Sequence, residues 1–402
     1  MVNSQEKINK SKEIISFDDT AIAFSSKSNS ELSKMYWLFA SMNNNFLVKA
    51  GTSALQFAFK FHFPFVKTIV KNTVFNHFCG GETIDDCEKS IQKLSEFNIG
   101  TILDYSVEGA KTDDGFEKTT LEIIATIKKA AGNKNIPFSV FKITGIASSE
   151  ILTKIQKGNA LSEQEKIDFD HAKSRVERIC QCAFDFKVRI FIDGEETWFQ
   201  DTIDSIAYEM MEKFNKQNVI IFNTFQMYRK DMLLNLKNAF NTAQEKGYLL
   251  GAKLVRGAYM EKERLEASVN SYPDPIQPDK ETTDKDYDEA LQFCIQHHPQ
   301  IAFCSGTHNE KSNYLLIRLM NENNISNNNP YIYFAQLYGM SDNLSYNLSH
   351  AGYNVAKYMP YGPVASVMPY LFRRAMENTA IAGQSSREFN LIKKEMERRK
   401  NK

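Results

Sequence analysis

The most constraining feature of this chain is a series of eight short β-rich runs that alternate with longer stretches of helical periodicity. The runs cover residues 100–104, 138–143, 188–193, 219–223, 249–255, 301–305, 331–336 and 355–358. Such alternation is typical of parallel βαβ units, and several runs are apolar nearly throughout, as strands covered on both faces should be. Eight units without a ninth predict a (β/α)8 barrel rather than an open doubly wound sheet.

Polar residues stand at or just beyond the C-terminal end of every predicted strand. In (β/α)8 barrels the chemistry is located at this end, in the loops that follow the strands. Any one such residue is as often a solvated strand end or part of a salt bridge, but eight strands in succession favour a functional site. The candidates are Asp104, Glu108, Lys142, Asp193, Glu195, Asn223, Gln226, Lys253, Arg256, Thr307, His308, Asn309, Gln336 and Tyr358.

The composition excludes several classes of protein. The 49 Lys and Arg residues balance 49 Asp and Glu residues, which argues against a nucleic-acid partner, and 42% hydrophobic residues argue against a mainly disordered chain. No apolar run reaches the ~18 residues of a membrane span, and we find no signal peptide or clear targeting signal. We therefore expect a cytoplasmic protein with reduced cysteines, in which any membrane contact is peripheral and at the inner face.

The N-terminal and C-terminal segments differ in composition from the rest. Between Glu31 and Glu82 there is no acidic residue, but there are five lysines and a phenylalanine at every second position from 57 to 65. We favour an arm that packs these phenylalanines against the barrel. The alternative is a basic aromatic surface that contacts anionic lipid or a lipid-soluble electron acceptor. Residues 386–402 carry many charges of both signs and predict a solvated helix.

The densest cluster of chemistry-bearing residues is the segment KYMPYGPVASVMPYLFRRAMEN, residues 357–378. It predicts a strand that leads through a Pro-Gly turn into an amphipathic helix, on which Tyr370, Arg373, Arg374 and Glu377 lie close together. Planar guanidinium groups bind carboxylates through paired hydrogen bonds, so two adjacent arginines suit a carboxylate ligand. The alternative is a surface ion pair between Arg373 and Glu377, which leaves one arginine without a matching charge.

A second motif, KLVRGAYMEKER, covers residues 253–264. It places a cation, Lys253, at the end of a predicted strand. Gly257 and Ala258 follow, and their small size allows the backbone to approach a flat ligand closely. Tyr259 comes next and offers an aromatic wall.

A third motif, GTHNE, covers residues 306–310. It supplies the hydrogen-bonding groups of Thr307, His308 and Asn309 at the end of the sixth predicted strand. A lone histidine such as His308 is more often structural than a ligand. Because we find no pair of histidines with a carboxylate at ligand spacing, we expect no metal site.

These motifs, in this order, resemble the proline dehydrogenase (proline oxidase) family. The similarity runs from Phe75, in FNHFCGGE, to Asn378, and the long N-terminal arm resembles the monofunctional, eukaryote-like branch. The resemblance implies a distorted (β/α)8 barrel that binds FAD noncovalently and oxidises L-proline to Δ1-pyrroline-5-carboxylate by hydride transfer. It also implies that electrons pass on to a membrane quinone and that the product is handed to pyrroline-5-carboxylate dehydrogenase.

The resemblance further implies a role for each candidate residue. A substrate-binding set would hold the proline carboxylate and enclose its ring: Lys142, Asp193, Tyr259, Leu337, Tyr358, Tyr370, Arg373, Arg374 and Glu377. Glu108 would act as a gate that closes the site by pairing with Arg373. A cofactor-binding set would contact FAD from its ring to its adenosine end: Asn223, Gln226, Lys253, Arg256, Gly257, Ala258, Thr307, His308, Asn309 and Gln336. Lys253 and Asn223 depart from the bacterial bifunctional branch, which has arginine and glutamine there.

We therefore expect three parts in the chain. Residues 1–95 form a mostly helical N-terminal arm, residues 96–380 form the FAD-binding barrel, and residues 381–402 form a charged helical tail. Three alternative functions stay open: a hydroxyproline dehydrogenase, a Schiff-base lyase or aldolase that uses Lys142 or Lys253, and a non-catalytic amino-acid-binding barrel. The resemblance places Tyr358 where it leaves little room for a 4-hydroxyl group, so we expect a preference for proline.

Overall fold

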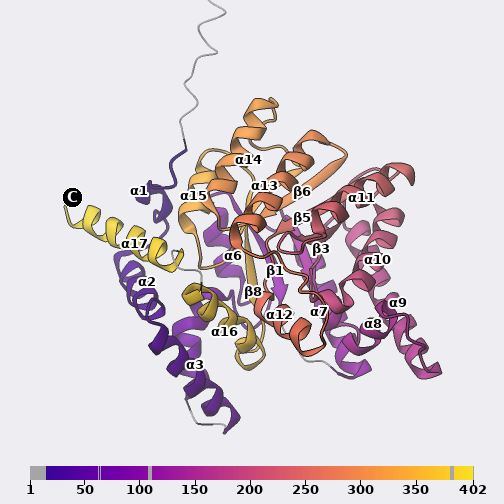
Figure 1. The fold of residues 1–402 in the computed structure, drawn as a ribbon. Coiled ribbons are helices and arrows are strands. Elements are labelled where there is room, and N and C mark those ends of the chain that lie inside the picture. The colour runs from indigo at the N-terminus through magenta and orange to yellow at the C-terminus, as the bar shows by residue number, and fades with distance from the viewer. Residues whose placement is uncertain (1–14, 62, 64, 107–110, 381–383, 402) are drawn as a thin grey trace, which may run out of the picture.

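A closed barrel of eight parallel strands forms the centre of the computed structural model, which describes residues 15–61, 63, 65–106, 111–380 and 384–401 (Figure 1). The strands are β1 (Ile99–Tyr105), β2 (Phe138–Phe141), β3 (Arg189–Ile192), β4 (Ile221–Gln226), β5 (Leu250–Val255), β6 (Ile301–Gly306), β7 (Ile332–Leu337) and β8 (Val355–Tyr361). Each overlaps one of the predicted runs, and β1 pairs with β8 to close the sheet. The predicted (β/α)8 barrel is therefore confirmed.

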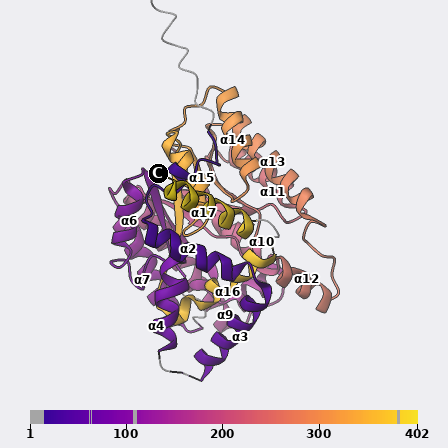
Figure 2. The same ribbon diagram turned by 90° about the vertical axis from the view of Figure 1, so that its left-hand side faces the viewer.

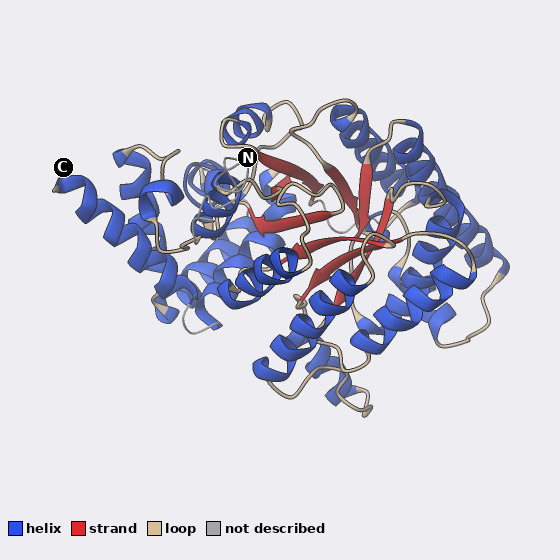
Figure 3. Cartoon of the chain, turned by 90° about the horizontal axis from the view of Figure 1, so that it is seen from above, coloured by secondary structure: helices blue, strands red, loops and turns tan. Residues whose placement is uncertain are grey.

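Helices surround the strands, as the view from above shows (Figure 3). They are α7 (Asp113–Ala130), α8 (Ser149–Gln156), α9 (Glu163–Asp185), α10 (Thr197–Phe214), α11 (Met232–Glu245), α12 (Met260–Val269), α13 (Lys280–Gln296), α14 (Glu310–Glu322), α15 (Asp342–His350) and α16 (Val364–Ala380). The units after β2 and β5 each carry an extra helix, α8 and α12. Both extra helices follow the C-terminal end of their strand, which is the end where a site is expected.

Side chains on each strand alternate between the barrel interior and the outer helices. Phe138 of β2 and Phe191 of β3 stack inside the barrel with their ring centres 4.4 Å apart. Lys142 and Asp193 follow at even spacings along the same two strands, so they belong to the interior face nearer the C-terminal ends. The alternation thus places a polar mouth above an apolar floor.

In the described part of the chain, six α-helices and one π-helix precede the barrel: α1 (Thr20–Ala23), α2 (Asn29–Met42), α3 (Asn45–Lys60), α4 (Val66–Val70), the π-helix η1 (Lys71–Phe75), α5 (Asn76–Phe78) and α6 (Glu88–Ser95). Ser28 and Glu31 form a reciprocal capping box that starts α2. The C-terminal helix, α17 (Gln384–Lys400), lies beside α2 on one side of the molecule (Figure 2). Leu55 of α3 and Val70 of α4 pack against Leu371 of α16, so the arm shares a core with the last helix of the barrel.

The structure contradicts the interpretation that the arm packs its phenylalanines against the barrel. The side chains of Phe57, Phe61, Phe63 and Phe65 are 57%, 57%, 53% and 76% exposed. The segment is not a strand with one buried face, because α3 continues to Lys60 with a 3.6-residue period and the rest lies in the turn before α4. The exposed rings therefore form a surface instead of a core.

The predicted C-terminal helix is present as α17, but it is not solvated on all sides as predicted. Leu391 and Ile392 of α17 are buried against Phe24 and Phe39 of the arm, and Glu388 on the same helix is buried as well. The apolar face is narrow, and the many charged residues around it concealed it in the sequence. The C-terminal helix is therefore an integral part of the fold.

Gly339 and Gly352 provide a matched test of the packing between the arm and the barrel. Both have positive φ, +78° and +82°, but a Cβ atom on Gly339 would lie 2.3 Å from the carbonyl oxygen of His77, whereas nothing lies within 4 Å at Gly352. We expect Gly352→Ala to lower the free energy of unfolding by about 1 kcal/mol, the usual cost of alanine in this conformation. Gly339→Ala should cost more than about 3 kcal/mol because of the added backbone clash. Urea unfolding measures both, and equal losses would contradict the predicted clash.

Candidate active site at the barrel mouth

A buried carboxylate, Asp193, joins three strands inside the barrel. Asp193 follows β3 and forms an ion pair with Lys253 of β5. The hydroxyl of Tyr358 on β8 donates to its other oxygen, Oδ2, at 2.7 Å, and Lys253 Nζ lies 4.9 Å from the centre of the Tyr358 ring. Burial raises the pKa of Tyr358 well above its ordinary value, so its hydroxyl keeps its proton. Asp193 therefore holds the side chains of both Lys253 and Tyr358 in place.

Tyr259, Lys142 and Arg373 come together from three separate segments of the mouth. Tyr259 precedes α12, Lys142 follows β2, and Arg373 lies in α16. Burial raises the pKa of Tyr259 to about 12, although the charges of Lys142 and Arg373 act in the opposite direction. The fold therefore brings two cations close to one protonated phenol.

Arg374 and Tyr370 stack on one face of α16. The guanidinium carbon of Arg374 lies 5.1 Å from the centre of the Tyr370 ring, and both side chains are buried. Leu337, the last residue of β7, packs against the same cluster. A buried arginine with an aromatic and an aliphatic neighbour is suited to a small anion that also has an apolar part.

Three neighbours hold Arg256 in one orientation just beyond β5. Its Nε donates to Asp284 Oδ1 at 2.6 Å, its Nη1 to Thr307 Oγ1 at 2.6 Å, and its Nη2 to Ser312 Oγ at 2.9 Å. The next residue, Gly257, has a φ of +132°, and a Cβ atom there would lie 2.5 Å from a ring atom of Tyr228. Gly257 and the following alanine are exposed at the rim, so their backbone is accessible to a ligand.

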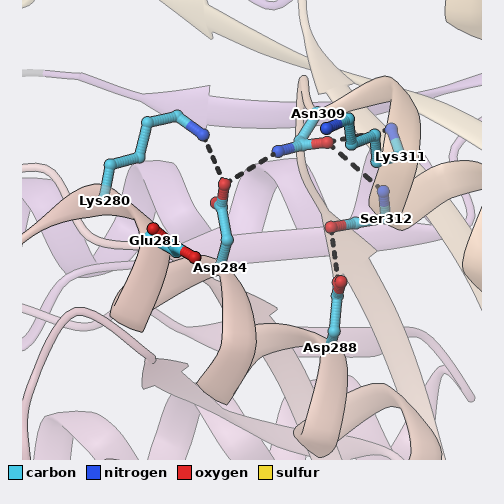
Figure 4. A pocket seen from close by; sticks show the side chains of 7 residues that line it. All are labelled: Lys280, Glu281, Asp284, Asp288, Asn309, Lys311 and Ser312. Atoms are coloured by element: carbon cyan, nitrogen blue, oxygen red, sulfur yellow. Dashed lines mark hydrogen bonds and ion pairs between the residues drawn. The ribbon is translucent and has the colours of Figure 1, made fainter.

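Two of the partners of Arg256, Asp284 and Ser312, also line a surface hollow of about 420 Å³ (Figure 4). Its walls come from α13 and from the start of α14, and its lining residues are Lys280, Glu281, Asp284, Asp288, Asn309, Lys311 and Ser312. The side-chain oxygen of Asn309 caps α14, while its amide nitrogen donates to Asp284 at 3.4 Å. Asn309 therefore borders an open polar hollow rather than the barrel interior.

Both ring nitrogens of His308 are engaged within the protein. Nδ1 lies 2.8 Å from Ser341 Oγ, and the backbone N–H of Leu337 donates to Nε2 at 3.4 Å. Burial lowers the pKa of His308 to about 3, and nearby positive charges, among them Lys357 and Arg374, add to the effect. The imidazole is therefore neutral near pH 7, with its proton on Nδ1.

Two residues of the predicted cofactor set, Asn223 and Gln336, lie on the outer face of the barrel. Asn223 Nδ2 donates to Asp204 of α10 at 2.8 Å, and Gln336 Oε1 accepts from Ser345 of α15 at 2.8 Å. The alternation of the strands turns both away from the mouth. Gln226 lies three residues after Asn223 and therefore on the opposite, inward face of β4. Its side-chain amide donates to a backbone carbonyl of the loop after β3 at 2.7 Å.

Two predicted residues cannot be placed in this site. Glu108 belongs to residues 107–110, which lie outside the described part of the chain, as does the side chain of Glu377 in α16. The predicted pairing of Glu108 with Arg373 stays a prediction.

Glu195 and Asp204 are buried carboxyl groups to which we had assigned no role. Burial raises the pKa of Glu195 to about 7 and that of Asp204 to about 6. Glu195 accepts the backbone N–H of Thr144 at 3.0 Å and thereby ties the loop after β3 to the loop after β2. Its place after a strand marked it as a candidate in the sequence, whereas Asp204 lies within α10 and no local pattern marks it.

The fold is therefore a (β/α)8 barrel of the kind found in many enzymes, and positively charged side chains line its mouth. A sequence profile described as proline dehydrogenase matches residues 87–387. A relative named "Proline dehydrogenase 1, mitochondrial", from Dictyostelium discoideum, is 32% identical over 95% of this chain and 74% of its own length. A Xenopus laevis relative named "Hydroxyproline dehydrogenase" is 31% identical over 82% of this chain and 78% of its own length.

Solved structures agree with the fold. A crystal structure of proline utilization A (PutA) from Bdellovibrio bacteriovorus, inactivated by N-propargylglycine, superposes with a TM-score of 0.76 at 19% identity and covers 93% of this chain. This chain spans 42% of that PutA chain. The chain belongs to the proline dehydrogenase family, which confirms the resemblance found in its motifs.

Glu195 predicts a dependence of stability on pH. Its pKa of about 7 in the folded protein exceeds the ~4.3 of an unfolded glutamate, so between these values only the unfolded state has released the proton. Its contribution to the free energy of unfolding therefore falls as the pH rises from about 4.5 to 7. Glu195→Gln cannot ionise, so we expect this variant to gain about 1–3 kcal/mol relative to wild type between pH 5 and pH 8.

Urea unfolding at the two pH values measures this gain. Glu163→Gln, at a carboxylate that is 88% exposed, is the control and should show no such gain. An identical pH dependence in wild type and Glu195→Gln would contradict the assignment.

Proposed function

We propose that this protein oxidises L-proline to Δ1-pyrroline-5-carboxylate with a bound flavin as the electron acceptor. The observation that carries the proposal is the cationic mouth of a proline dehydrogenase-family barrel, to which Lys142, Lys253, Arg373 and Arg374 contribute. A carboxylate needs such cations, and the aromatic side chains among them suit an aliphatic ring. Electron chemistry requires a cofactor, because none of these side chains accepts a hydride.

In this proposal the substrate is positioned by charge and by shape. Arg373, Arg374 and Lys142 bind the carboxylate, while Tyr259 and Tyr358, together with Tyr370 and Leu337, enclose the ring. Both Tyr259 and Tyr358 stay protonated at neutral pH, so no phenolate competes with the carboxylate. Positive charge around the substrate amine lowers its pKa and favours release of its proton to solvent without a dedicated base.

The residues of the mouth fit FAD as the cofactor. Lys253 and the backbone at Gly257 and Ala258 are assigned to the flavin ring, since the close contact with Tyr228 excludes a side chain at Gly257. The immobilised guanidinium of Arg256, with Thr307 and Asn309, is assigned to the pyrophosphate and adenosine end, beside the hollow in Figure 4. When bound, FAD would accept a hydride from the substrate carbon.

The geometry changes the proposed roles of His308, Asn223 and Gln336 but not that of Gln226. Gln226 remains a candidate for contact with the cofactor, because it faces the barrel interior and its side chain holds the loop after β3. His308 contributes indirectly, because both of its ring nitrogens already have partners in Ser341 and Leu337. Asn223 and Gln336 hold the strands to α10 and α15 and act on the cofactor indirectly.

Flavin reduction tests the proposed function. We expect the protein to bind FAD, L-proline to bleach the flavin absorbance without oxygen, and kcat/KM to be at least roughly 10-fold higher for proline than for trans-4-hydroxyproline. The reason for the preference is that Asp193 holds the Tyr358 hydroxyl in place, so the phenol cannot turn aside for a 4-hydroxyl group. Equal values of kcat/KM would contradict the preference and favour a hydroxyproline dehydrogenase.

Other outcomes distinguish the remaining classes of function. A protein that binds FAD but is not reduced by proline would be an amino-acid-binding barrel. A colourless protein that takes up no FAD would contradict the proposal, and borohydride trapping with a carbonyl substrate would then test Lys142 and Lys253 as Schiff-base lysines. The ion pair of Lys253 with Asp193 argues against this role, because its Nζ is already engaged.

We also propose that the electrons pass to a membrane quinone at a lipid surface, and that pyrroline-5-carboxylate dehydrogenase consumes the product. The support is the exposed aromatic face formed by Phe46, Phe57, Phe61, Phe63 and Phe65, which lies on α3 and the turn before α4. Helices α3 and α4 both pack on α16, which carries Arg373 and Arg374 of the mouth. Lys67 and Lys71 share a single carboxylate, Glu82, so this pair of lysines keeps a net positive charge that suits anionic lipid. Exposed aromatic rings suit the interface of such a membrane.

This contact would be peripheral, at the inner face of the membrane. Within the described ranges, no helix combines the length and the apolar character that crossing a bilayer requires. The cytoplasmic location stays a prediction, since the Dictyostelium relative is named as mitochondrial.

Vesicle co-sedimentation tests the aromatic face. We expect the protein to sediment with vesicles that contain phosphatidylglycerol and less with phosphatidylcholine alone, and high salt should weaken binding. The double variant Phe57→Ser/Phe65→Ser should reduce the bound fraction at least about fivefold, because it removes two inserting rings. The control Phe184→Ser/Phe186→Ser alters two other exposed phenylalanines, each 45% exposed, and should bind as wild type does. Equal binding of the two double variants would contradict the proposal.

A further inference from the structure

The loop between β7 and α15 has a backbone that needs outside support. It contains Gly339 at a φ of +78° and Ser341 at a φ of +50°. A left-handed conformation is easy for glycine but strained for serine, which carries a Cβ atom. Such a conformation persists where surrounding contacts determine it.

Contacts from three distant parts of the chain meet at this loop. From the arm, His77 Nε2 lies 2.7 Å from the carbonyl oxygen of Gly339, and from β8, Lys357 Nζ donates to another loop carbonyl at 2.5 Å. From the C-terminal helix, the carboxylate of Glu388 accepts the backbone N–H of Ser341 at 2.9 Å. The last of these contacts acts directly on the strained residue.

Glu388 also belongs to a buried cluster of ionisable side chains. Asp342, next to Ser341, forms ion pairs with Lys27 at 3.2 Å and with Lys357 at 2.9 Å. These two lysines outweigh the burial of Asp342 and hold its pKa well below its usual range. Glu388 is the second acidic group of the cluster, and burial together with the charge of Asp342 raises its pKa to about 7. Buried charges of this kind are costly to leave unmatched.

The same loop positions two residues of the barrel mouth. Ser341 Oγ lies 2.8 Å from His308 Nδ1, and the backbone N–H of Leu337, where the loop begins, donates to His308 Nε2 at 3.4 Å. A shift of Ser341 would therefore turn the imidazole and move Leu337. A continuous series of contacts leads from α17 to the mouth.

We propose that Glu388 is a positioning residue of the barrel mouth, acting through Ser341 to hold His308 and Leu337 in place from the C-terminal helix. Glu388 itself contacts the loop backbone, and among the described side chains it has no hydrogen bond or ion pair with those assigned to substrate. The kinetic consequence rests on the proposed proline oxidation, whereas the structural consequence does not.

Amide hydrogen exchange of the full-length protein without added ligands tests the structural consequence. Glu388→Ala removes the acceptor of the Ser341 N–H, so we expect exchange of the amides of residues 337–342 to accelerate at least roughly tenfold. Glu388→Gln retains one acceptor oxygen and should restore much of the protection. Glu397→Gln, at an exposed position of the same helix, should match wild type. If Glu388→Ala does not fold, the comparison of Glu388→Gln with Glu397→Gln decides, and we expect faster exchange only in Glu388→Gln.

Steady-state kinetics with proline tests the second consequence. We expect Glu388→Ala to raise KM several-fold more than it lowers kcat, since the displaced Leu337 would weaken binding of the ring, and Glu388→Gln to recover part of the loss. Unchanged exchange in residues 337–342, or an equal rise in exchange over all eight strands, would overturn the proposal. If wild type did not oxidise proline, the proposed function would fail while the exchange result still decided the part played by Glu388.

Discussion

Closure of eight parallel strands imposes a two-residue alternation on every strand, and the site depends on this constraint. Asp193, Lys253 and Tyr358 come from β3, β5 and β8, yet they reach one another because each lies on the inward side of its strand near the mouth. Inside a closed barrel these charges have little access to water, so each must find its partner in the protein. The barrel therefore supplies both the position and the electrostatic reason for the cluster.

The same alternation explains how much of the site could be predicted from the sequence. Apolar runs and polar strand ends are local patterns, and they located all eight strands and the mouth. The face on which Asn223 or Gln336 lies depends on the register with neighbouring strands, and a shift of one residue reverses it. Motif resemblance assigned both residues to the cofactor without that information, whereas Gln226 and Lys253 lie in the opposite phase.

The helices of the arm and of the C-terminal tail were predicted, but their packing could not be, because their partners are distant in sequence. Leu391 and Ile392 become core residues where they meet Phe24 and Phe39, and no window of the sequence contains both pairs. The phenylalanines near Phe57 differ in the opposite direction: their hydrophobicity suggests that they belong to a core, yet the structure leaves them exposed. Local hydrophobicity indicates that a segment needs a partner but does not identify the partner.

The packing of α17 on the first helices also constrains the order in which the protein can fold. Arg399 donates to the carbonyl of Phe24, 375 positions earlier in the chain. During synthesis α1 and α2 emerge before α17, so Phe24 and Phe39 lack the side chains that cover them until α17 has left the ribosome. The packing of these two helices is therefore completed only after the barrel has been translated, and their apolar face stays exposed until then. Nascent chains of this protein should therefore depend on protection of that face more than the compact barrel alone would suggest.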